Sequence, residues 1–416
     1  MAQTLRQSFR LADLRRRILF TAAMLVVFRL GAHIPIPGID PTKIEQLLTS
    51  GTLFGFLDVV SGGALRNLSI FAMSIIPYIN ASIILQLLTL VIPRLEEWAK
   101  EGAEGQRKIA QWTRYGTAIL GLVQATGTAV LLSREGAFLR PGFASAAVAV
   151  IGLTAGTLFL MWLGELITDR GIGNGISLLI FAGILSRLPG GVNTVYQYLH
   201  GGVANIFNVI VMVVLGLAVI ALVVVVQQAA RRIPVQYAKR VVGRRMYGGQ
   251  ATHIPLRVNQ AGVIPVIFAA AVLSLPATLA TFFPVFTAVN NWLMGGIYPV
   301  LYALLIIGFT FFYTVIVFNP VDVADNIRKY GGFIPGIRPG RPTTDYLTRI
   351  LNRVTFAGAI FLALVAVLPF FFGRLVGIPN LNFGGTALLI VVGVALESMK
   401  QIESQMLMRH YEGFLR

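Results

Sequence analysis

The stretch "IFNVIVMVVLGLAVIALVVVV", residues 206–226, decides the class of this protein because no charged residue interrupts it. A helix of about 20 such residues spans the ~30 Å hydrocarbon layer of a bilayer. The whole chain of 416 residues is 56% hydrophobic and 12% charged, with a mean hydropathy of +0.76. A soluble domain carries about 25% charged residues. The sequence therefore predicts an all-α, polytopic membrane protein.

Similar apolar stretches lie on both sides of this one and together predict ten transmembrane helices. The predicted spans are 18–36, 70–92, 115–133, 144–167, 173–189, 206–226, 261–283, 297–318, 354–373 and 383–400. Of the 34 Lys and Arg residues, 27 then fall on the side that holds both termini, and Arg29 lies within the first span. The opposite side receives Lys43, Arg66, Arg134, Arg140, Arg187 and Arg374. Because cytoplasmic loops carry the excess of Lys and Arg, we expect both termini in the cytoplasm.

The sequence offers few groups that could perform chemistry. It has no cysteine, which excludes disulfides and thiolate metal sites, and its four histidines are far apart. The ionisable residues within the predicted spans, Arg29, Glu165 and Glu397, are interpreted as interfacial or helix-pairing groups. The glycine-rich "GIGNGIS" at 171–177 lacks the preceding strand and the following Lys of a phosphate-binding loop. We therefore predict no enzyme and no cofactor, and we attribute the net charge of +17 to topology rather than to nucleic-acid binding.

Two stretches far apart in the chain resemble each other: "IIPYINASIIL" at 75–85 and "VIPVIFAAAVL" at 263–273. Aligned without a gap, they share Ile76/Ile264, Pro77/Pro265, Ile79/Ile267, Ala81/Ala269 and Leu85/Leu273. A chance match between apolar spans is the alternative, but the stretches fall at corresponding places, in the second and seventh spans. Five spans per half would give the halves opposite orientations, as in many transport proteins. We therefore predict two pseudo-symmetric halves, 1–190 and 191–416, with Pro77 and Pro265 kinking equivalent helices.

Three segments between the spans also carry structural information. Residues 51–69, "GTLFGFLDVVSGGALRNLS", are apolar enough to enter a membrane cavity but too short and glycine-broken to span. A re-entrant segment must be buried in protein or line a cavity, so this one implies a cavity. Two basic loops, 227–260 and 319–353, contain prolines, glycines and aromatic residues, and we do not expect them to be disordered spacers.

Seven motifs occur in a characteristic order along nearly the whole chain. They are "IIPYINASIILQLLT", "EGQRKIAQWTRYGT", "DRGIGNGISLLIFAGI", "RRIPVQYAKR", "THIPLRVNQAGVIPVIFA", "GGFIPGIRPG" and "LNFGGTALLIVVGVALE". Together they resemble bacterial SecY, the central subunit of the protein-conducting channel. The resemblance implies a clamshell of two five-helix halves, hinged between the fifth and sixth spans, around an hourglass pore.

The resemblance also implies roles for individual residues. Spacing places two pairs of residues each on one helical face: Ile75 with Ile79, and Ile176 with Ile180. From spacing alone, such isoleucines would more often pack in the protein core or against lipid than line a pore. Carried over by motif, an aliphatic pore waist would comprise Ile75, Ile79, Ile176, Ile180, Ile267 and Ile390. A plug, about 57–69 in extent, would rest on the external side of the waist and include Leu57, Asp58, Val59, Val60, Ser61, Gly62, Gly63, Ala64, Leu65, Arg66 and Asn67. A lateral gate, between spans two and three on one side and seven and eight on the other, would include Pro77, Asn80, Pro265 and Leu275.

The implied function is a passive channel in the bacterial cell membrane for unfolded secretory polypeptides. Signal sequences and nascent transmembrane segments would pass sideways into lipid. The SecA motor ATPase or the ribosome would dock on the basic loops through Lys239, Arg240, Arg244, Arg245 and Arg338, and small subunits of the SecE and SecG types would accompany the chain. From the residues alone, the alternative is an ion-coupled secondary transporter, which shares inverted repeats but needs polar or acidic groups at the membrane midplane.

Overall fold

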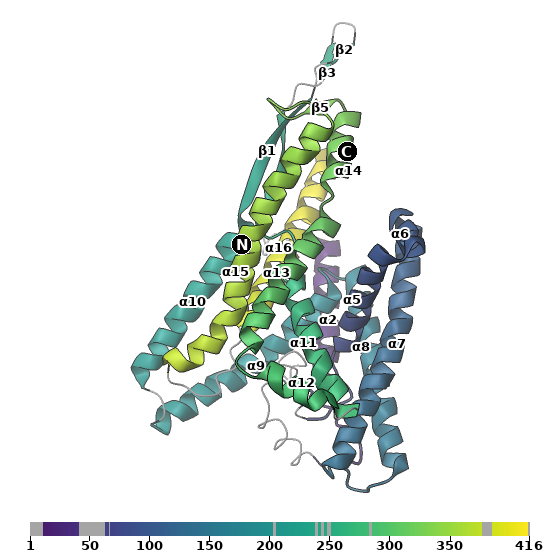
Figure 1. Cartoon of the computed structure of the whole chain (residues 1–416), viewed down its shortest axis with the longest axis vertical. Coiled ribbons are helices and arrows are strands. Elements are labelled where there is room, and N and C mark those ends of the chain that lie inside the picture. The colour runs from purple at the N-terminus through teal and green to yellow at the C-terminus, as the bar shows by residue number, and fades with distance from the viewer. Residues whose placement is uncertain are drawn as a thin grey trace.

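The computed structural model describes residues 11–40, 63–65, 67–202, 205–237, 240–242, 245–247, 251–282, 285–376 and 385–414. Its long helices form an elongated bundle, and β-strands extend from one end of that bundle (Figure 1). Helices of the first half, coloured purple to blue, pack beside helices of the second half, coloured green to yellow. The described residues are mostly helical, which confirms the predicted fold class.

Each predicted span of the first half contains a helix. These helices are α2 (Ala12–Gly31), α5 (Ile76–Val91), α7 (Ala103–Arg134), α8 (Phe143–Arg170) and α9 (Gly175–His200). The chain bends by 102° between α5 and the short helix α6 (Pro93–Lys100). Pro93 begins α6, where its missing N–H is not needed for a helical hydrogen bond.

The second half repeats this arrangement. Its long helices are α10 (Ile206–Gln228), α11 (Ile264–Phe282), α13 (Tyr298–Val317), α15 (Arg341–Val376) and α16 (Gly385–Phe414). Two shorter helices, α12 (Val285–Met294) and α14 (Pro320–Lys329), lie on either side of α13 in the sequence.

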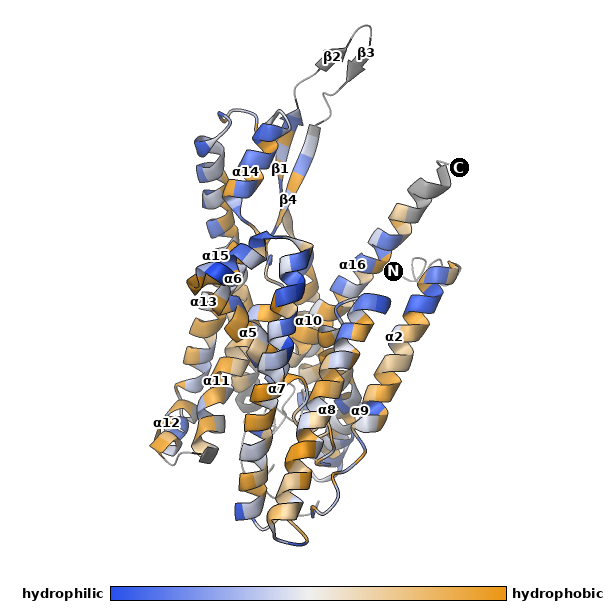
Figure 2. Ribbon diagram, turned by 90° about the vertical axis from the view of Figure 1, so that its right-hand side faces the viewer, coloured by the Kyte–Doolittle hydropathy of each residue, from blue (hydrophilic) through white to orange (hydrophobic). Residues whose placement is uncertain are grey.

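Hydrophobicity and length identify the helices that can cross a membrane. Among the described residues, six helices meet both requirements, or seven if α5 and α6 form one span. The other predicted spans fall on α2, α11 and α16, so the order of helices follows the order of predicted spans. In Figure 2, hydrophobic residues dominate the lower part of the bundle, whereas hydrophilic residues gather toward the end that carries the strands. This distribution fits a protein whose strand-bearing end lies outside the hydrocarbon layer.

Helix contacts follow the same pattern in both halves. In the first half, α2 touches α8 and α9, α5 touches α7 and α8, and α8 touches α7 and α9. In the second half, α10 touches α15 and α16, α11 touches α13 and α15, and α15 touches α13 and α16. Counted in chain order, these are the same helix pairs. The halves meet where α11 contacts α5 and α7, and where α16 contacts α9.

The two basic loops fold together into a β-sheet that the sequence did not predict. Strand β1 (Ala230–Tyr237) pairs antiparallel with β4 (Ala251–Arg257) and with β5 (Gly332–Phe333) of the other loop. Strands β2 (Arg240–Val242) and β3 (Arg245–Tyr247) form a separate hairpin. Buried residues of the larger sheet, including Ile233 and Leu256, pack with Ile327 of α14 and Leu347 of α15. The loops are therefore a folded unit, as expected from their composition.

Segments assigned to the same side of the membrane lie together. Leu14 at the start of α2 packs with Ile172 of the α8–α9 turn and with Ile402 of α16. At the other end of the bundle, β-bridges join Pro35 to Ser69 and Ile39 to Phe138. Both groups of contacts agree with the predicted alternation of the spans.

The expectation for the two prolines was wrong. Pro77 and Pro265 are each the second residue of a helix, α5 and α11, so neither kinks a helix in its middle. The fixed φ of proline suits the first helical turn, and both prolines therefore begin their helices.

Helix α9 extends beyond the predicted span, through Pro189 to His200. Arg187, which was assigned to the outer side, therefore lies in the middle of this helix.

Candidate functional site

The isoleucines assigned to the pore waist gather in one apolar cluster. Ile75, Ile79, Ile180 and Ile390 are buried members of this cluster, and Ile176 and Ile267 pack against it. They come from α5, α9, α11 and α16, and so from both halves of the chain. Ile75 is 1% exposed and Ile390 is 2% exposed. Helices distant in sequence thus bring together side chains that offer no hydrogen bonds.

Five of the six waist residues share a position that sequence reasoning missed. Ile75 is the N-cap of α5, and Ile79, Ile176, Ile180 and Ile267 lie within the first two turns of their helices. Helices α5, α9 and α11 therefore begin at the waist. Because the N-terminal end of a helix carries a partial positive charge, these ends add an unfavourable field for cations at this point.

The described part of the predicted plug segment reaches the apolar cluster that contains the waist isoleucines. Ala64 is fully buried and belongs to the same apolar cluster as the waist isoleucines. Leu65 packs against a neighbouring cluster, while Asn67 donates its N–H to the carbonyl of Gly63 at 3.3 Å. The other predicted plug residues, Leu57, Asp58, Val59, Val60, Ser61, Gly62 and Arg66, lie outside the described residues.

Backbone strain is concentrated between the plug segment and α5. Leu68 has φ +38° and Ser74 has φ +54°, values that non-glycine residues rarely adopt. Each such residue costs about 1–3 kcal/mol and persists only where the surroundings impose it. Ser74 immediately precedes Ile75, so the strain lies between two elements assigned to the closed pore.

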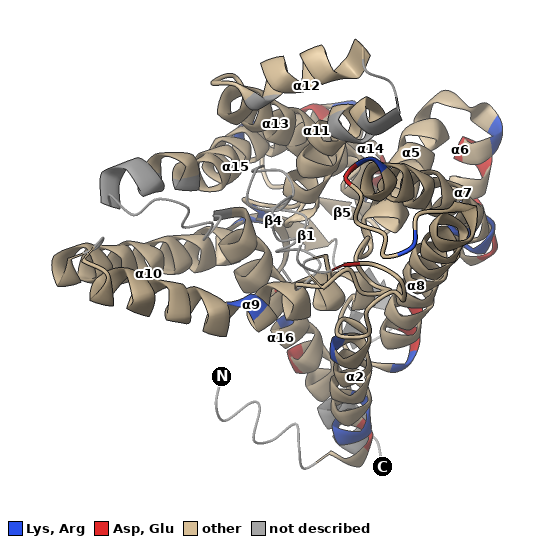
Figure 3. Cartoon of the chain, turned by 90° about the horizontal axis from the view of Figure 1, so that it is seen from below, with Lys and Arg blue, Asp and Glu red and all other residues tan. Residues whose placement is uncertain are grey.

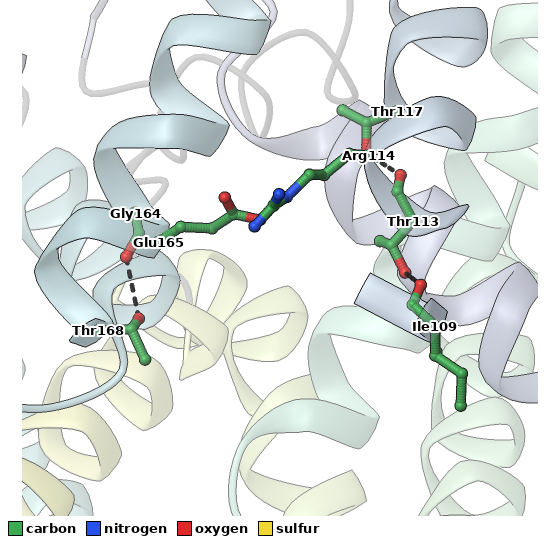
Figure 4. Close-up of polar contacts among 7 residues, drawn as sticks. All are labelled: Ile109, Thr113, Arg114, Thr117, Gly164, Glu165 and Thr168. Carbon is green, nitrogen blue, oxygen red and sulfur yellow. Dashed lines mark hydrogen bonds and ion pairs between the residues drawn. The ribbon is translucent and has the colours of Figure 1, made fainter. Parts of the chain in front are cut away.

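A tight turn between α8 and α9 positions two waist residues. Thr168 donates its hydroxyl to the carbonyl of Gly164 at 2.9 Å (Figure 4) and accepts the Gly175 N–H at 2.9 Å. Asn174 caps α9 by accepting the N–H of Ser177 at 3.2 Å. A methyl group on Gly175 would overlap the carbonyl of Gly164, so this turn needs glycine for close approach. The motif "GIGNGIS" is therefore a structural turn that directs α9 toward the waist.

Gly164→Ala is expected to destabilise this turn. The added methyl group would overlap Cδ1 of Ile176, and overpacking of this kind typically costs about 1–3 kcal/mol. The matched control is Gly190→Ala in α9, where an added methyl group meets nothing within 4 Å. Thermal unfolding of the detergent-purified variants should give a lower midpoint for Gly164→Ala than for Gly190→Ala. Equal midpoints would contradict the positioning role.

The helices assigned to the lateral gate are in contact. Helix α11 packs against α5 and α7, and its Phe268 makes an edge-to-face contact with Phe309 of α13 at 5.9 Å between ring centroids. Asn80 is 5% exposed, and its Nδ2 has no hydrogen-bond partner within the described part of the chain. Leu275, farther along α11, is 39% exposed. Burying an unpaired amide is costly, so Asn80 makes the packing around α5 less stable than an apolar residue would.

A polar contact beside the gate explains one of the charged residues within the predicted spans. Arg114 of α7 donates from Nε to Glu165 of α8 at 2.8 Å, which confirms the helix-pairing interpretation of Glu165 (Figure 4).

Outside the spans, Lys100 Nζ lies 2.6 Å from Glu96 on α6, and this hydrogen bond raises the pKa of the Lys100 ammonium.

The described residues among those predicted to dock a partner lie at the strand-bearing end. Arg338 is exposed in the turn between β5 and α15, where its carbonyl accepts the hydroxyl of buried Thr343 at 2.9 Å. Arg240 and Arg245 begin β2 and β3, whereas Lys239 and Arg244 lie outside the described residues. Seen from the opposite end, uncharged residues make up most of the helices (Figure 3).

Comparison with known proteins decides the family. A protein-family model described as SecY matches residues 69–399. This chain belongs to the SecY family. Two SecY relatives, each named protein translocase subunit SecY, come from Halalkalibacterium halodurans and Thermotoga maritima. The Halalkalibacterium halodurans protein is 50% identical over 431 residues, and the match covers 100% of both chains. The Thermotoga maritima protein is 46% identical over 428 residues, and the match covers 100% of this chain and 98% of that one.

Solved SecY-type structures have the same fold. A SecY channel determined in a study of the plug domain and the closed state has a TM-score of 0.66 at 21% identity, covering 94% of this chain and 92% of that one. Sec61 in a canine ribosome-channel complex has a TM-score of 0.60 at 19% identity, with the same coverage. The resemblance found in the sequence motifs is thus confirmed.

Proposed function

We propose that this chain is the channel-forming subunit of a protein translocase and passes unfolded polypeptides across the bacterial cell membrane. The observation that carries the proposal is the convergence of isoleucines from both halves in one apolar cluster, to which Ala64 also belongs. A channel component needs no catalytic groups, which agrees with the prediction that the protein is not an enzyme. The halves 1–190 and 191–416 would be the two valves of the clamshell, supported by their matching helix contacts.

An isoleucine waist suits a channel that must be closed to ions and open to many sequences. Water gains no hydrogen bonds from such a ring, so a narrow waist can dewet and block ions. Branched aliphatic side chains can change rotamer around a passing chain and make few specific contacts with it. A selective transporter would need placed polar groups instead, whereas the six side chains assigned to the waist are all aliphatic.

The seam between α5 and α11 would open the pore toward lipid. Each central Leu or Ile of a nascent segment then favours the membrane by about 0.3–0.6 kcal/mol, while each charge costs about 2.5–3.5 kcal/mol. Ten apolar residues therefore outweigh one charge, whereas a polar segment stays in the pore. Partitioning alone would sort signal sequences and transmembrane segments.

The folded basic unit at the strand-bearing end would bind the partner that supplies the driving force. Positive charge on exposed loops suits ribosomal RNA phosphates or an acidic face of the SecA motor, and binding to RNA would weaken with salt. The relationship to Sec61 in a ribosome-channel complex supports the ribosome as a partner of this surface. Subunits of the SecE and SecG types, and cytoplasmic termini, belong to the same proposal.

A cysteine pair across the seam tests the function. Because the chain has no cysteine, Asn80→Cys with Leu275→Cys creates a single possible disulfide within one molecule. We expect oxidation to join α5 to α11, to stop SecA-driven transport into proteoliposomes, and to allow transport again after reduction. The single variants serve as controls. Transport that continues through the cross-linked protein, or uptake of a small solute driven by an ion gradient alone, would favour the transporter alternative.

A further inference from the structure

One arginine lies inside the bundle beside the plug segment. Arg187 belongs to α9, and its Nε and Nη2 atoms are shielded from solvent. A methyl group placed on Gly63 would lie 3.6 Å from Arg187 Nε and 3.8 Å from Nη2. The guanidinium therefore lies against the backbone of the segment that precedes buried Ala64.

The residue before this arginine ties α9 to α2. Arg29 of α2 donates from Nη1 to the hydroxyl of Ser186 at 3.2 Å, and Ser186 donates to the carbonyl of Gly183 at 2.7 Å. Helices α2 and α9 also pack against each other. These contacts hold the turn of α9 that carries Arg187 against α2, and the charge of Arg29 acts on Arg187.

The buried charge of Arg187 indicates a functional role. An ionisable residue within a membrane span is rare and usually has a functional role. Burying a guanidinium is costly unless its five donors are engaged, so its neighbours matter to its stability. Gly63 has φ +88° and no side chain, which lets the arginine approach the backbone closely. A residue with a side chain would be strained at this φ, although its Cβ would lie at ordinary contact distance from Arg187.

We propose that Arg187 is a latch that holds the plug segment in its closed position. The inference rests on the proposed function, because it requires residues 63–65 to be part of a plug. In the closed state Arg187 packs on Gly63, which helps to keep Ala64 seated against the waist. When the plug leaves, that contact is lost and water entering the pore surrounds the guanidinium. Arg187 is a positioning residue and contacts no substrate.

The test is the resting ion conductance of purified channels in planar bilayers. Arg187→Met keeps the length of the side chain but removes its charge and donors, and should raise the conductance about tenfold because the segment at Gly63 loses its buried charged neighbour. Arg187→Lys keeps the charge and should give a smaller increase. Arg134→Met, at an exposed arginine of α7, is the matched control and should leave the conductance unchanged.

A further variant separates the possible failures. Ile79→Gly reports on the waist independently of the latch. If Ile79→Gly raises the conductance and Arg187→Met does not, the latch is wrong while the proposed function stands; if neither does, the proposed function fails. If Arg187→Met does not fold, Arg187→Lys tests the same contact, because it replaces the guanidinium by a smaller ammonium group. An unchanged conductance in Arg187→Lys would then overturn the latch.

Discussion

Replacing Ile79 or Ile390 with glycine is expected to raise the resting ion conductance of the reconstituted protein by about tenfold or more, because these side chains form part of the proposed seal. Both side chains are buried in the waist cluster, with 8% and 2% exposure. Deleting a large buried aliphatic side chain typically costs about 2–5 kcal/mol, because neighbouring groups fill the space only partly. At the waist the emptied space admits water, and a hydrated constriction conducts ions.

The control for this experiment separates the seal from helix propensity. Glycine lowers the stability of any helix interior by about 1 kcal/mol relative to alanine. Ile151→Gly in α8 imposes the same propensity cost at a side chain that is 68% exposed and faces outward. Its conductance should match that of the unmodified protein. A leak of equal size in all three variants would show that loosened helices, and not the waist, carry the ions.

Arg338→Glu is expected to lower SecA-driven translocation by about tenfold or more while leaving the protein folded, because like charges facing each other across an interface cost several kcal/mol. Arg338 is exposed. In the part of the chain that the structure describes, its backbone carbonyl accepts a hydrogen bond, whereas its side chain makes none. Reversing its charge should therefore disturb a partner rather than the loop. Transport of a purified precursor into proteoliposomes measures the effect.

Arg134→Glu provides a control with the same change in net charge. Arg134 is exposed at the end of α7, in a segment assigned to the opposite side from the basic loops. Transport should be close to normal in this variant. Near-normal transport in Arg338→Glu as well would refute a docking role for the turn between β5 and α15.

Sequence patterns predicted the features that depend on local composition. Apolar length predicted a helix at each span, because the bilayer thickness sets the number of residues needed. The repeated Ile-Pro pairs at 76–77 and 264–265 marked equivalent helix starts, although their prolines were expected to kink the helices. A proline restricts the backbone in the same way in the first turn of a helix and at a kink within a helix. Its position relative to the helix start therefore cannot be read from local sequence alone.

The sequence by itself determined that this chain spans a membrane many times, carries its positive charge in a few loops, and shares the motifs of the SecY family. Tertiary structure decided which distant residues lie together. Ile75 and Ile390 belong to one apolar cluster, Arg187 lies beside Gly63, and strand β1 pairs with β5. The physical reason is that hydrophobicity and helix formation depend on neighbours along the chain. Contacts between helices and between loops depend instead on how distant segments fill space together, and no local pattern encodes that arrangement.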